Sequence, residues 1–210
     1  MNNYNNTTKL KIAVTGGIGS GKSFALQYIA SLDFPVFSCD EIYKQVILSK
    51  EYIEKIQQVF PECVIGNQIN RKKLAEIVFS NDAQMKQLNN IAHPLIMEQL
   101  FNDMARAQAN LVFAEVPLLF EEGYEDQFDF VFIIQRSLEE RIESVKKRDG
   151  LSQEEILRRI RSQFDYSQIS TLDYYKNPKF IIIENTTDIE GVKVNLHSAI
   201  NQLEKAVCET

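Results

Sequence analysis

The sequence predicts an α/β fold, a five-stranded parallel sheet with helices on both faces, extended by a helical insertion and a helical lid. Short apolar runs, the length of buried strands, alternate with longer segments in which apolar residues recur every three or four positions. Continuous apolar strands alternating with amphipathic helices are typical of parallel sheets covered by helices. We expect the five strands at residues 9–15, 34–37, 111–116, 128–134 and 180–183.

The helical pattern divides the chain into a core and an insertion. We expect helices at 21–32, 138–148, 152–168 and 188–207, and an almost wholly helical block from 40 to 109. Within that block, Asn81 and Asp82 indicate the start of a longer helix, and Pro94 is expected to break a helix or begin one. The predicted domains are a nucleotide-binding core at 1–40 and 110–210, an insertion at 41–109, and a lid at 138–168 within the core.

A glycine-rich loop follows the first expected strand and precedes the first expected helix. Residues 15–23 read Thr-Gly-Gly-Ile-Gly-Ser-Gly-Lys-Ser and fit the P-loop pattern G-x-x-x-x-G-K-[ST]. Glycines let successive backbone N–H groups surround a polyphosphate, and the helix N-terminus adds partial positive charge. The loop therefore predicts a P-loop nucleoside triphosphate hydrolase-like fold that binds a nucleotide through Gly17, Ile18, Gly19, Ser20, Gly21, Lys22, Ser23 and Phe24.

Two carboxylates are candidates for the chemistry beside this loop. Asp40 follows the second expected strand, at the carboxyl edge where ligands bind in open sheets, and could orient or deprotonate an attacking hydroxyl. It could also cap a helix over 41–48. Glu115 ends the third strand, where it could bind Mg²⁺ together with the hydroxyl of Ser23.

Cations gather between residues 136 and 161, in an otherwise acidic chain. Two helices joined at Asp149-Gly150 could fold over a nucleotide, and Arg148 at their junction could stabilise the transferring phosphoryl group. Surface ion pairs with neighbouring glutamates are the alternative explanation. The basic residues are Arg136, Arg141, Lys146, Lys147, Arg148, Arg158, Arg159 and Arg161.

Composition narrows the class of protein. The chain has 210 residues and a net charge of −6, which disfavours nucleic acid as a partner. Its three cysteines, Cys39, Cys63 and Cys208, form no C-x-x-C pair, which suits a reducing compartment. The N-terminus lacks the apolar core of a signal peptide, and no apolar run is long enough for a membrane span. We therefore expect a cytoplasmic protein that binds no membrane.

A P-loop alone leaves several activities open. A GTP switch needs an Asn-Lys-x-Asp stretch for guanine, which the sequence lacks, and remodelling ATPases are usually larger. A small P-loop protein with a helical insertion and a basic mobile segment is typical of a small-molecule kinase. The alternatives are a kinase for another metabolite or nucleotide, and a nucleotide-dependent switch or binding protein.

The chain resembles the dephospho-CoA kinase family from Lys11 to about Asn185. Beside the glycine-rich loop, the resemblance is carried by Cys-Asp-Glu-Ile (39–42), Leu-Asn-Asn-Ile-Ala-His-Pro-Leu-Ile (88–96), Val-Pro-Leu-Leu-Phe-Glu (116–121), Lys-Arg-Asp-Gly-Leu-Ser (147–152) and Arg-Ile-Arg-Ser-Gln (159–163). It implies that ATP donates its γ-phosphoryl group to the ribose 3′-hydroxyl of dephospho-CoA, with Mg²⁺. It also implies a catalytic Asp40, a catalytic lid arginine at Arg148, and an acceptor-binding role for Asp40 and His93. Lys22 of the P-loop is the third expected catalytic residue, and we expect a monomer.

The chain departs from the family pattern at several positions. Ser38 replaces the first Asp of an Asp-x-Asp pair, and Phe24 stands where Thr commonly follows the P-loop serine. Ser144 occupies a lid position where the family usually shows Arg, so the lid's positive charge is expected from Lys147, Arg148 or Arg159. The loop 173–179 is longer and lacks the usual Ala-Asp. After the last strand, Asn185 and Thr186 lie where such enzymes often hold the adenine base.

Overall fold

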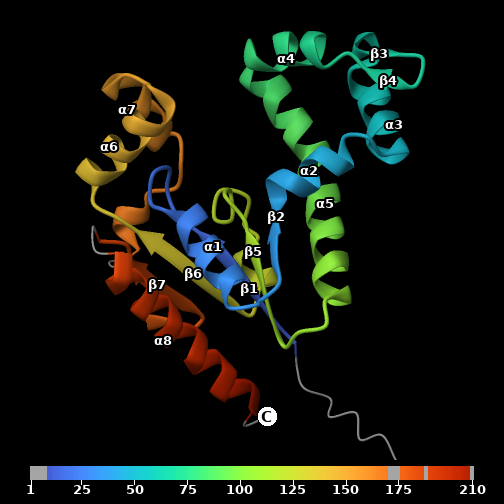
Figure 1. The fold of residues 1–210 in the computed structure, drawn as a ribbon. Coiled ribbons are helices and arrows are strands. Elements are labelled where there is room, and N and C mark those ends of the chain that lie inside the picture. The colour runs from blue at the N-terminus through green and yellow to red at the C-terminus, as the bar shows by residue number, and fades with distance from the viewer. Residues whose placement is uncertain (1–8, 170–175, 187–188, 209–210) are drawn as a thin grey trace, which may run out of the picture. The chain divides into compact units, whose positions relative to one another are not determined.

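The computed structural model describes residues 9–169, 176–186 and 189–208, and its elements are labelled in Figure 1. The chain divides into two compact units. The first contains Met1–Val36 and Ala107–Thr210, and the second contains Phe37–Arg106. The predicted boundaries of the insertion, 41 and 109, lie close to these limits, and its role in binding the acceptor stays a prediction.

The predicted five-stranded sheet belongs mostly to the first unit, and its edge strand at 36–38 continues from Val36 into the second unit. Its strands are β1 (Leu10–Thr15), β2 (Val36–Ser38), β5 (Leu111–Glu115), β6 (Phe130–Gln135) and β7 (Phe180–Glu184), in the order β2-β5-β1-β6-β7. β1 pairs in parallel with β5 and with β6, and β6 with β7. The central strand β1 is thus flanked by later strands on both sides, which places its carboxyl end at the switch point where open α/β sheets bind ligands.

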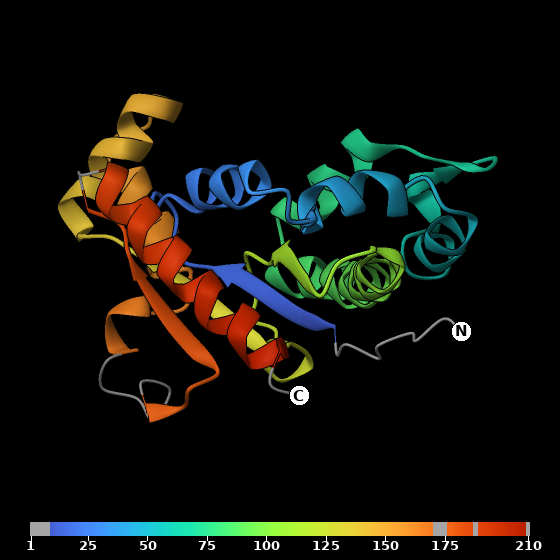
Figure 2. The same ribbon diagram turned by 60° about the horizontal axis from the view of Figure 1, so that its bottom comes forward.

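Helices α1 (Lys22–Ser31) and α8 (Ile189–Cys208) pack on one face of this sheet (Figures 1 and 2). Their apolar residues, including Ile29 and Leu196, join strand residues such as Phe113 and Phe132 in one buried cluster. Strand residues directed to the other face, such as Ala13, are also buried. Burial on both faces explains why these strands read as continuous apolar runs rather than as alternating ones.

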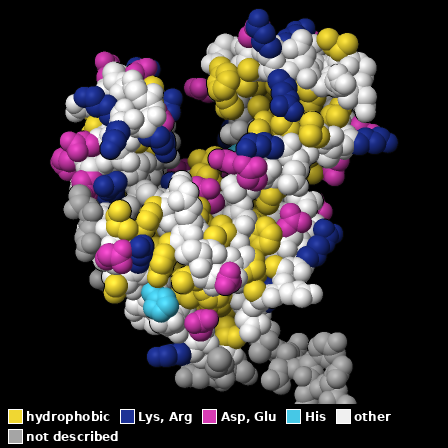
Figure 3. All heavy atoms as spheres, viewed as in Figure 1, with side chains coloured by type: hydrophobic (Ala, Val, Ile, Leu, Met, Phe, Trp, Pro, Cys, Tyr) yellow, Lys and Arg dark blue, Asp and Glu magenta, His cyan; other side chains and the backbone are white. Residues whose placement is uncertain are grey.

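Helices α6 (Leu138–Asp149) and α7 (Gln153–Arg161) form the hairpin predicted as a lid. The hydroxyl of Ser137 accepts a hydrogen bond from the N–H of Glu140 at the start of α6, and Gly150 ends that helix with a φ of 67°. A capping box between Ser152 and Glu155 begins α7. Figure 3 shows acidic and basic side chains interspersed over this hairpin. A short turn, η3 (Tyr166–Gln168), replaces the predicted end of the second helix, and another, η2 (Glu125–Gln127), precedes β6.

The second unit is mainly helical. Its elements are α2 (Cys39–Val46), α3 (Lys50–Val59), η1 (Pro61–Cys63), β3 (Val64–Ile65), β4 (Gln68–Ile69), α4 (Arg71–Phe79) and α5 (Asp82–Arg106). Helices α2, α3 and α4 all pack against the long helix α5. The start of α5 is as predicted, because the side chain of Asn81 accepts a hydrogen bond from the N–H of Ala83 at 2.9 Å.

One expectation for this unit is wrong, and one is confirmed with an addition. Pro94 neither breaks nor begins a helix, because α5 continues through it. The exposed Pro94 is followed by buried residues such as Leu95 and Leu100, whose packing outweighs the local cost of an interior proline. The block is almost wholly helical, as predicted, but it also contains a short antiparallel hairpin of β3 and β4 around Gly66, which has a φ of 63°.

Candidate active site

The glycine-rich loop lies between the carboxyl end of the central strand β1 and the start of α1. Its position confirms the predicted strand–loop–helix arrangement. Gly21 precedes the helix in a left-handed conformation, with φ 97°, and no side chain caps this end. The N–H groups at the start of α1 are therefore directed toward the loop, as in other sites that bind anions at helix N-termini.

The side chain of Lys22 folds back over this loop. Its ammonium group donates hydrogen bonds to the carbonyl oxygens of Gly16, at 2.6 Å, and Gly17, at 3.2 Å. Burial lowers the pKa of Lys22 to about 8, with further lowering by the charges of Arg141 and Arg148, while Glu115 opposes the shift. Lys22, Arg141 and Arg148 thus lie near one another in a partly buried region, and this concentration of positive charge favours the binding of a polyanion.

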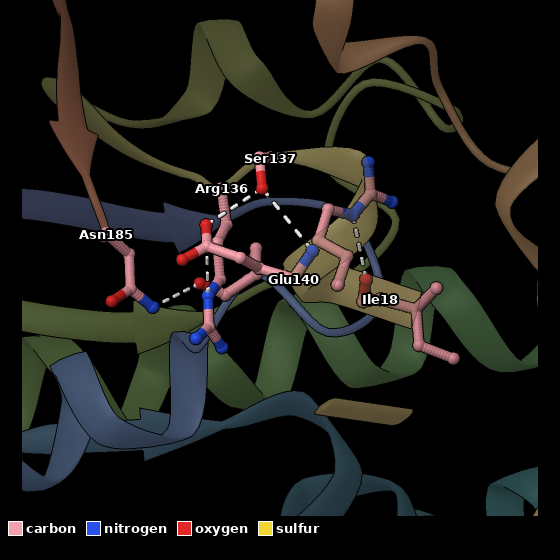
Figure 4. A network of polar contacts seen from close by, with 7 residues as sticks. Ile18, Arg136, Ser137, Glu140 and Asn185 are labelled. Carbon is pink, nitrogen blue, oxygen red and sulfur yellow. Dashed lines mark hydrogen bonds and ion pairs between the residues drawn. The ribbon is translucent and has the colours of Figure 1, made fainter. Parts of the chain in front are cut away.

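The peptide group of Ile18, within the loop, is held from both sides by the segment that carries the hairpin. The N–H of Ile18 donates to the Oε1 atom of Gln163 at 2.7 Å, and its carbonyl accepts from Nε of Arg141 at 2.9 Å. Figure 4 labels Ile18 and draws the hydrogen bond to its carbonyl as a dashed line. Arg141 belongs to α6 and Gln163 lies just beyond α7. The two ends of the hairpin therefore grip one peptide of the loop.

Helix α6 approaches the loop closely at two glycines, and one of them requires glycine. A Cβ atom at Gly17 would meet the guanidinium group of Arg141, the movable end of a long side chain. Gly19 has a φ of 77°, and a Cβ atom there would lie 2.6 Å from the carbonyl oxygen of Arg141. Glycine at position 19 thus makes room for the backbone of α6.

The other side of the loop contacts the residue that follows β7. Nδ2 of Asn185 donates to the carbonyl oxygen of Ser20 at 2.5 Å, a contact that Figure 4 also shows. The structure therefore gives Asn185 a part in holding the loop, and the predicted contact of Asn185 and Thr186 with adenine stays a prediction. Phe24 packs partly buried against the core, and its N–H donates to the carbonyl of Gly21 at 3.1 Å.

A second set of contacts fastens the end of the hairpin segment to β1. The hydroxyl groups of Tyr166 and Thr15 lie 3.0 Å apart and are buried. Burial raises the pKa of Tyr166 to about 12, so this phenol is neutral at physiological pH. The N–H of Phe164 donates to Glu121 at 2.7 Å, and the Phe164 ring stacks on Phe120 with centroids 4.6 Å apart. The Glu121 carboxylate thus accepts a hydrogen bond from the backbone at the end of the hairpin segment.

The two predicted metal ligands belong to the same unit as the loop. Ser23 is the exposed second residue of α1, and Glu115 is the half-buried last residue of β5, paired in register with Val14 of β1. The attraction between Glu115 and the Lys22 ammonium places this carboxylate near the loop. No group of three or more His, Cys, Asp or Glu suited to a metal occurs among the described residues. Two oxygen donors suit Mg²⁺, which usually takes its remaining ligands from water and phosphate.

Arg148 stands near the tip of the hairpin. Its Nε atom lies 2.7 Å from Oδ1 of Asp149, and 61% of its side-chain surface is exposed. The hydrogen bond to Asp149 raises the pKa of Arg148 above its usual value. Arg148 still influences the Lys22 ammonium electrostatically, so it belongs to the surroundings of the loop.

Asp40 and His93 lie in the second unit. Asp40 is exposed and is the second residue of α2, because that helix begins at Cys39. It therefore cannot cap a helix over 41–48, although its charge suits the first turn of a helix. His93 is half-buried within α5.

Sequence reasoning did not single out Arg141, Gln163 or Tyr166, which contact the loop or the strand before it. Arg141 was one of eight basic residues, and its spacing of seven from Arg148 places both on one face of a helix. Gln163 ended a motif without an assigned role. Nothing in the sequence indicated that Tyr166 would meet Thr15, 151 positions away.

The chain is similar to proteins of one family over most of its length. The sequence model of the dephospho-CoA kinase family matches residues 10–189. A dephospho-CoA kinase of Thermus thermophilus is 34% identical over 192 residues, which span 91% of each chain. One of Bacillus licheniformis is 32% identical over 198 residues, spanning 91% of this chain and 96% of that protein.

Solved structures agree with these similarities. A Thermus thermophilus protein of 34% identity matches with a TM-score of 0.76, covering 93% of this chain and 98% of the other. A Campylobacter jejuni dephospho-CoA kinase, 29% identical, matches with a TM-score of 0.64, covering 95% and 99%. A shikimate kinase of Acinetobacter baumannii, 12% identical with a TM-score of 0.53, covers 95% and 96% and shares the fold alone. Within the described residues, no helix has the length and apolar character needed to cross a membrane.

Proposed function

The chain belongs to the dephospho-CoA kinase family, and from that premise we propose how its residues divide the work of the family's reaction. The protein is an ATP-dependent kinase that phosphorylates the ribose 3′-hydroxyl of dephospho-CoA, which gives CoA and ADP in the last step of CoA synthesis. The observation that carries the residue assignment is the Lys22 ammonium, buried over the glycine-rich loop beside further positive charge. That excess positive charge matches a nucleotide polyphosphate.

The loop binds the donor. The N–H groups of Gly17 to Phe24 surround the phosphates of ATP, and Lys22 exchanges its two loop carbonyls for β- and γ-phosphate oxygens. Arg148 stabilises the charge that spreads over the transferring phosphoryl group. Among the residues that the structure describes, the exposed guanidinium of Arg148 pairs with Asp149 alone, so it can exchange that partner for a phosphate at little cost.

Asp40 prepares the acceptor. Its carboxylate accepts the proton of the ribose 3′-hydroxyl while the oxygen attacks the γ-phosphorus, and the bond from that phosphorus to the β–γ bridging oxygen breaks. ADP is the leaving group. The second unit, with His93, binds dephospho-CoA, and the α6–α7 hairpin excludes water that would otherwise accept the phosphoryl group.

Ser23 and Glu115 would hold Mg²⁺ beside the phosphates, Glu115 directly or through water. Mg²⁺ would neutralise charge on the β- and γ-phosphate oxygens when bound. The enzyme acts as a cytoplasmic monomer, without nucleic acid or membrane as partners. The acidic net charge disfavours nucleic acid as a partner, and the lack of a C-x-x-C pair suits a reducing compartment.

The activity is tested by following ADP with and without dephospho-CoA, and with EDTA in place of Mg²⁺. We expect one ADP for each CoA formed, little ADP without the acceptor, and no turnover in EDTA. Equal ADP production with and without dephospho-CoA would contradict the kinase activity.

The role of Asp40 is tested by Asp40→Asn. Loss of the carboxylate removes the proton acceptor, so we expect kcat to fall by about 10²–10⁴-fold while the Kd for ATP changes by less than about threefold. Glu41→Gln is the matched control, because Glu41 is also an exposed acid in the first turn of α2. Equal kinetics for the two variants would contradict a catalytic role for Asp40 and would leave it only a charge that suits the start of α2.

A further inference from the structure

Arg141 differs from the other cations of the hairpin segment in its surroundings. Its side chain is half-buried, its Nε donates to the Ile18 carbonyl at 2.9 Å, and its Nη2 lies against Gly17. Within the residues that the structure describes, no carboxylate forms an ion pair with Arg141, and neither terminal nitrogen forms a hydrogen bond. The charge of Asp165 attracts Arg141 without forming an ion pair, so the partly buried guanidinium keeps a desolvation cost that a ligand anion would offset.

The neighbouring cations are otherwise engaged or exposed. Nε of Arg136 is buried without a hydrogen bond to the described residues, but Arg136 forms an ion pair with Glu140, whose Oε2 lies 3.7 Å away on the network that Figure 4 shows. Arg148 pairs with Asp149. Lys147 and Arg159, which the sequence suggested as substitutes for the missing lid arginine, are exposed. Arg141 is therefore the cation of this segment that the fold holds against the loop.

Residue 144 lies on the same face of α6, one helical turn after Arg141. The next residue, Val145, is fully buried, and its Cγ2 would lie 2.9 Å from a Cβ atom at Gly19. The face of α6 that contacts the loop thus runs through 141 and 145. Ser144 stands where the resemblance to the family leads one to expect arginine, and a serine cannot reach as far or carry charge.

We propose that Arg141 is the arginine through which the lid of this protein binds the polyphosphate of ATP. It takes the place of the arginine expected at position 144, one helical turn further along α6. The proposal rests on the kinase activity proposed above. With Nε held by the Ile18 carbonyl, the two terminal nitrogens can donate to phosphate oxygens in a fixed orientation. Burial lowers the pKa of Arg141, which agrees with a guanidinium that a phosphate would stabilise.

The assignment is tested by Arg141→Gln in steady-state assays with dephospho-CoA. Loss of a phosphate-binding guanidinium should lower kcat/KM for ATP by about 30–1,000-fold. The KM for dephospho-CoA should change by less than about threefold, because Arg141 does not bind the acceptor. Arg136→Gln is the matched control, since Arg136 precedes the same helix but pairs with Glu140, and we expect it to stay within about threefold of the wild type.

A second variant separates phosphate binding from support of the loop. Adding Ser144→Arg to Arg141→Gln returns a guanidinium to the same face of α6 without restoring the bond from Nε of Arg141 to Ile18. We expect kcat/KM for ATP to recover by at least about tenfold. Thermal melting of each variant shows whether the fold is intact.

Two results would overturn the assignment. The first is a loss of less than about threefold for Arg141→Gln, and the second is a larger loss that Ser144→Arg does not restore. If the wild type makes no CoA, the proposed activity fails, but the inference is still tested by the affinity for a fluorescent ATP analogue. In that assay, we expect Arg141→Gln to bind about tenfold or more weakly, and unchanged affinity refutes the inference.

Discussion

Burial lowers the pKa of Lys22 to about 8 although two carbonyls accept hydrogen bonds from its ammonium group. In the unfolded chain this amine has its usual pKa of 10.5, so the unfolded state binds more protons between these two values. Stability therefore rises with pH across that window, and the penalty for charging Lys22 is fully present below pH 8. Its size is on the order of 1–3 kcal/mol.

We predict that Lys22→Met abolishes turnover and stabilises the ligand-free protein. At pH 7 its free energy of unfolding should exceed that of the wild type by about 1–3 kcal/mol, because the buried charge is gone. The difference in unfolding free energy between variant and wild type should be smaller at about pH 9.5, because Lys22 of the folded wild type is then mostly deprotonated. Urea denaturation at both pH values measures this difference.

Lys72→Met is the control, since Lys72 is exposed. It should change stability by less than about 0.5 kcal/mol at either pH. A Lys22→Met protein that is less stable than the wild type at pH 7 would show that the hydrogen bonds to Gly16 and Gly17 outweigh the burial of charge.

Single residues were predictable where the local sequence itself carries the chemistry. The glycine spacing identified Lys22 and its loop, because the pattern and the strand before it are contiguous in the chain. Arg141 and Gln163 could not be found in this way, because their roles depend on which face of the hairpin meets the loop. That choice is made by packing between segments more than 100 positions apart, such as Ile18 and Arg141.

At the scale of elements, the turn η3 ties the end of the hairpin segment to the central strand. Tyr166 and Thr15 share a buried hydrogen bond of 3.0 Å, and Nε2 of Gln135 donates to the carbonyl of Tyr166 at 3.1 Å. Edge-to-face contacts of Tyr166 with Phe120 and Phe164 complete the attachment. The hairpin is therefore attached to the last residue of β1, directly before the loop that it would cover.

We predict that Tyr166→Phe and Thr15→Val each lower the free energy of unfolding by about 1–2 kcal/mol. Each variant removes one of the two hydroxyl groups and leaves the other buried without its hydrogen-bond partner. The double variant should cost about as much as one single variant, because it leaves neither hydroxyl. Urea denaturation of all four proteins gives the coupling energy, and strictly additive losses would show that the two hydroxyls do not interact.

The elements themselves were largely predictable, with instructive exceptions. All five strands of the main sheet appear near their predicted places, because burial on both faces gives continuous apolar runs. Pro94 misled the prediction, since the packing of α5 overrides a local preference. The hairpin of β3 and β4 was missed because its strands are two residues long, too short for any periodicity.

At the scale of the whole molecule, the two compact units each have buried residues of their own, such as Phe113 in the first and Tyr52 in the second. The net charge of −6 contrasts with the positive charge around Lys22. Long-range attraction therefore contributes little to binding a polyanion, which must depend on short contacts with a few cations.

We predict that the two substrates protect different units from hydrogen exchange. A non-hydrolysable ATP analogue alone should slow exchange most in residues 15–24 and 138–163, where loop and hairpin contact each other. Dephospho-CoA alone should slow exchange in 40–46 and 88–96 of the second unit. Mass spectrometry of peptides measures both, and protection of the first unit alone by dephospho-CoA would refute the assignment of the insertion to the acceptor.

The grip on the Ile18 peptide has a consequence for which anions the loop admits. Gln163 and Arg141 occupy the two polar atoms of this peptide, and Lys22 occupies two neighbouring carbonyls, before any ligand arrives. An anion that binds these donors must displace Gln163 from the Ile18 N–H and the two carbonyls from Lys22, whereas an anion that enters a hydrated loop displaces only water. The bond from Nε of Arg141 to the Ile18 carbonyl can remain. A lone orthophosphate can replace few of the displaced contacts at once, while a triphosphate can replace several. We therefore expect the loop to bind a triphosphate much more tightly than orthophosphate, because only the longer anion can replace several of the internal contacts together.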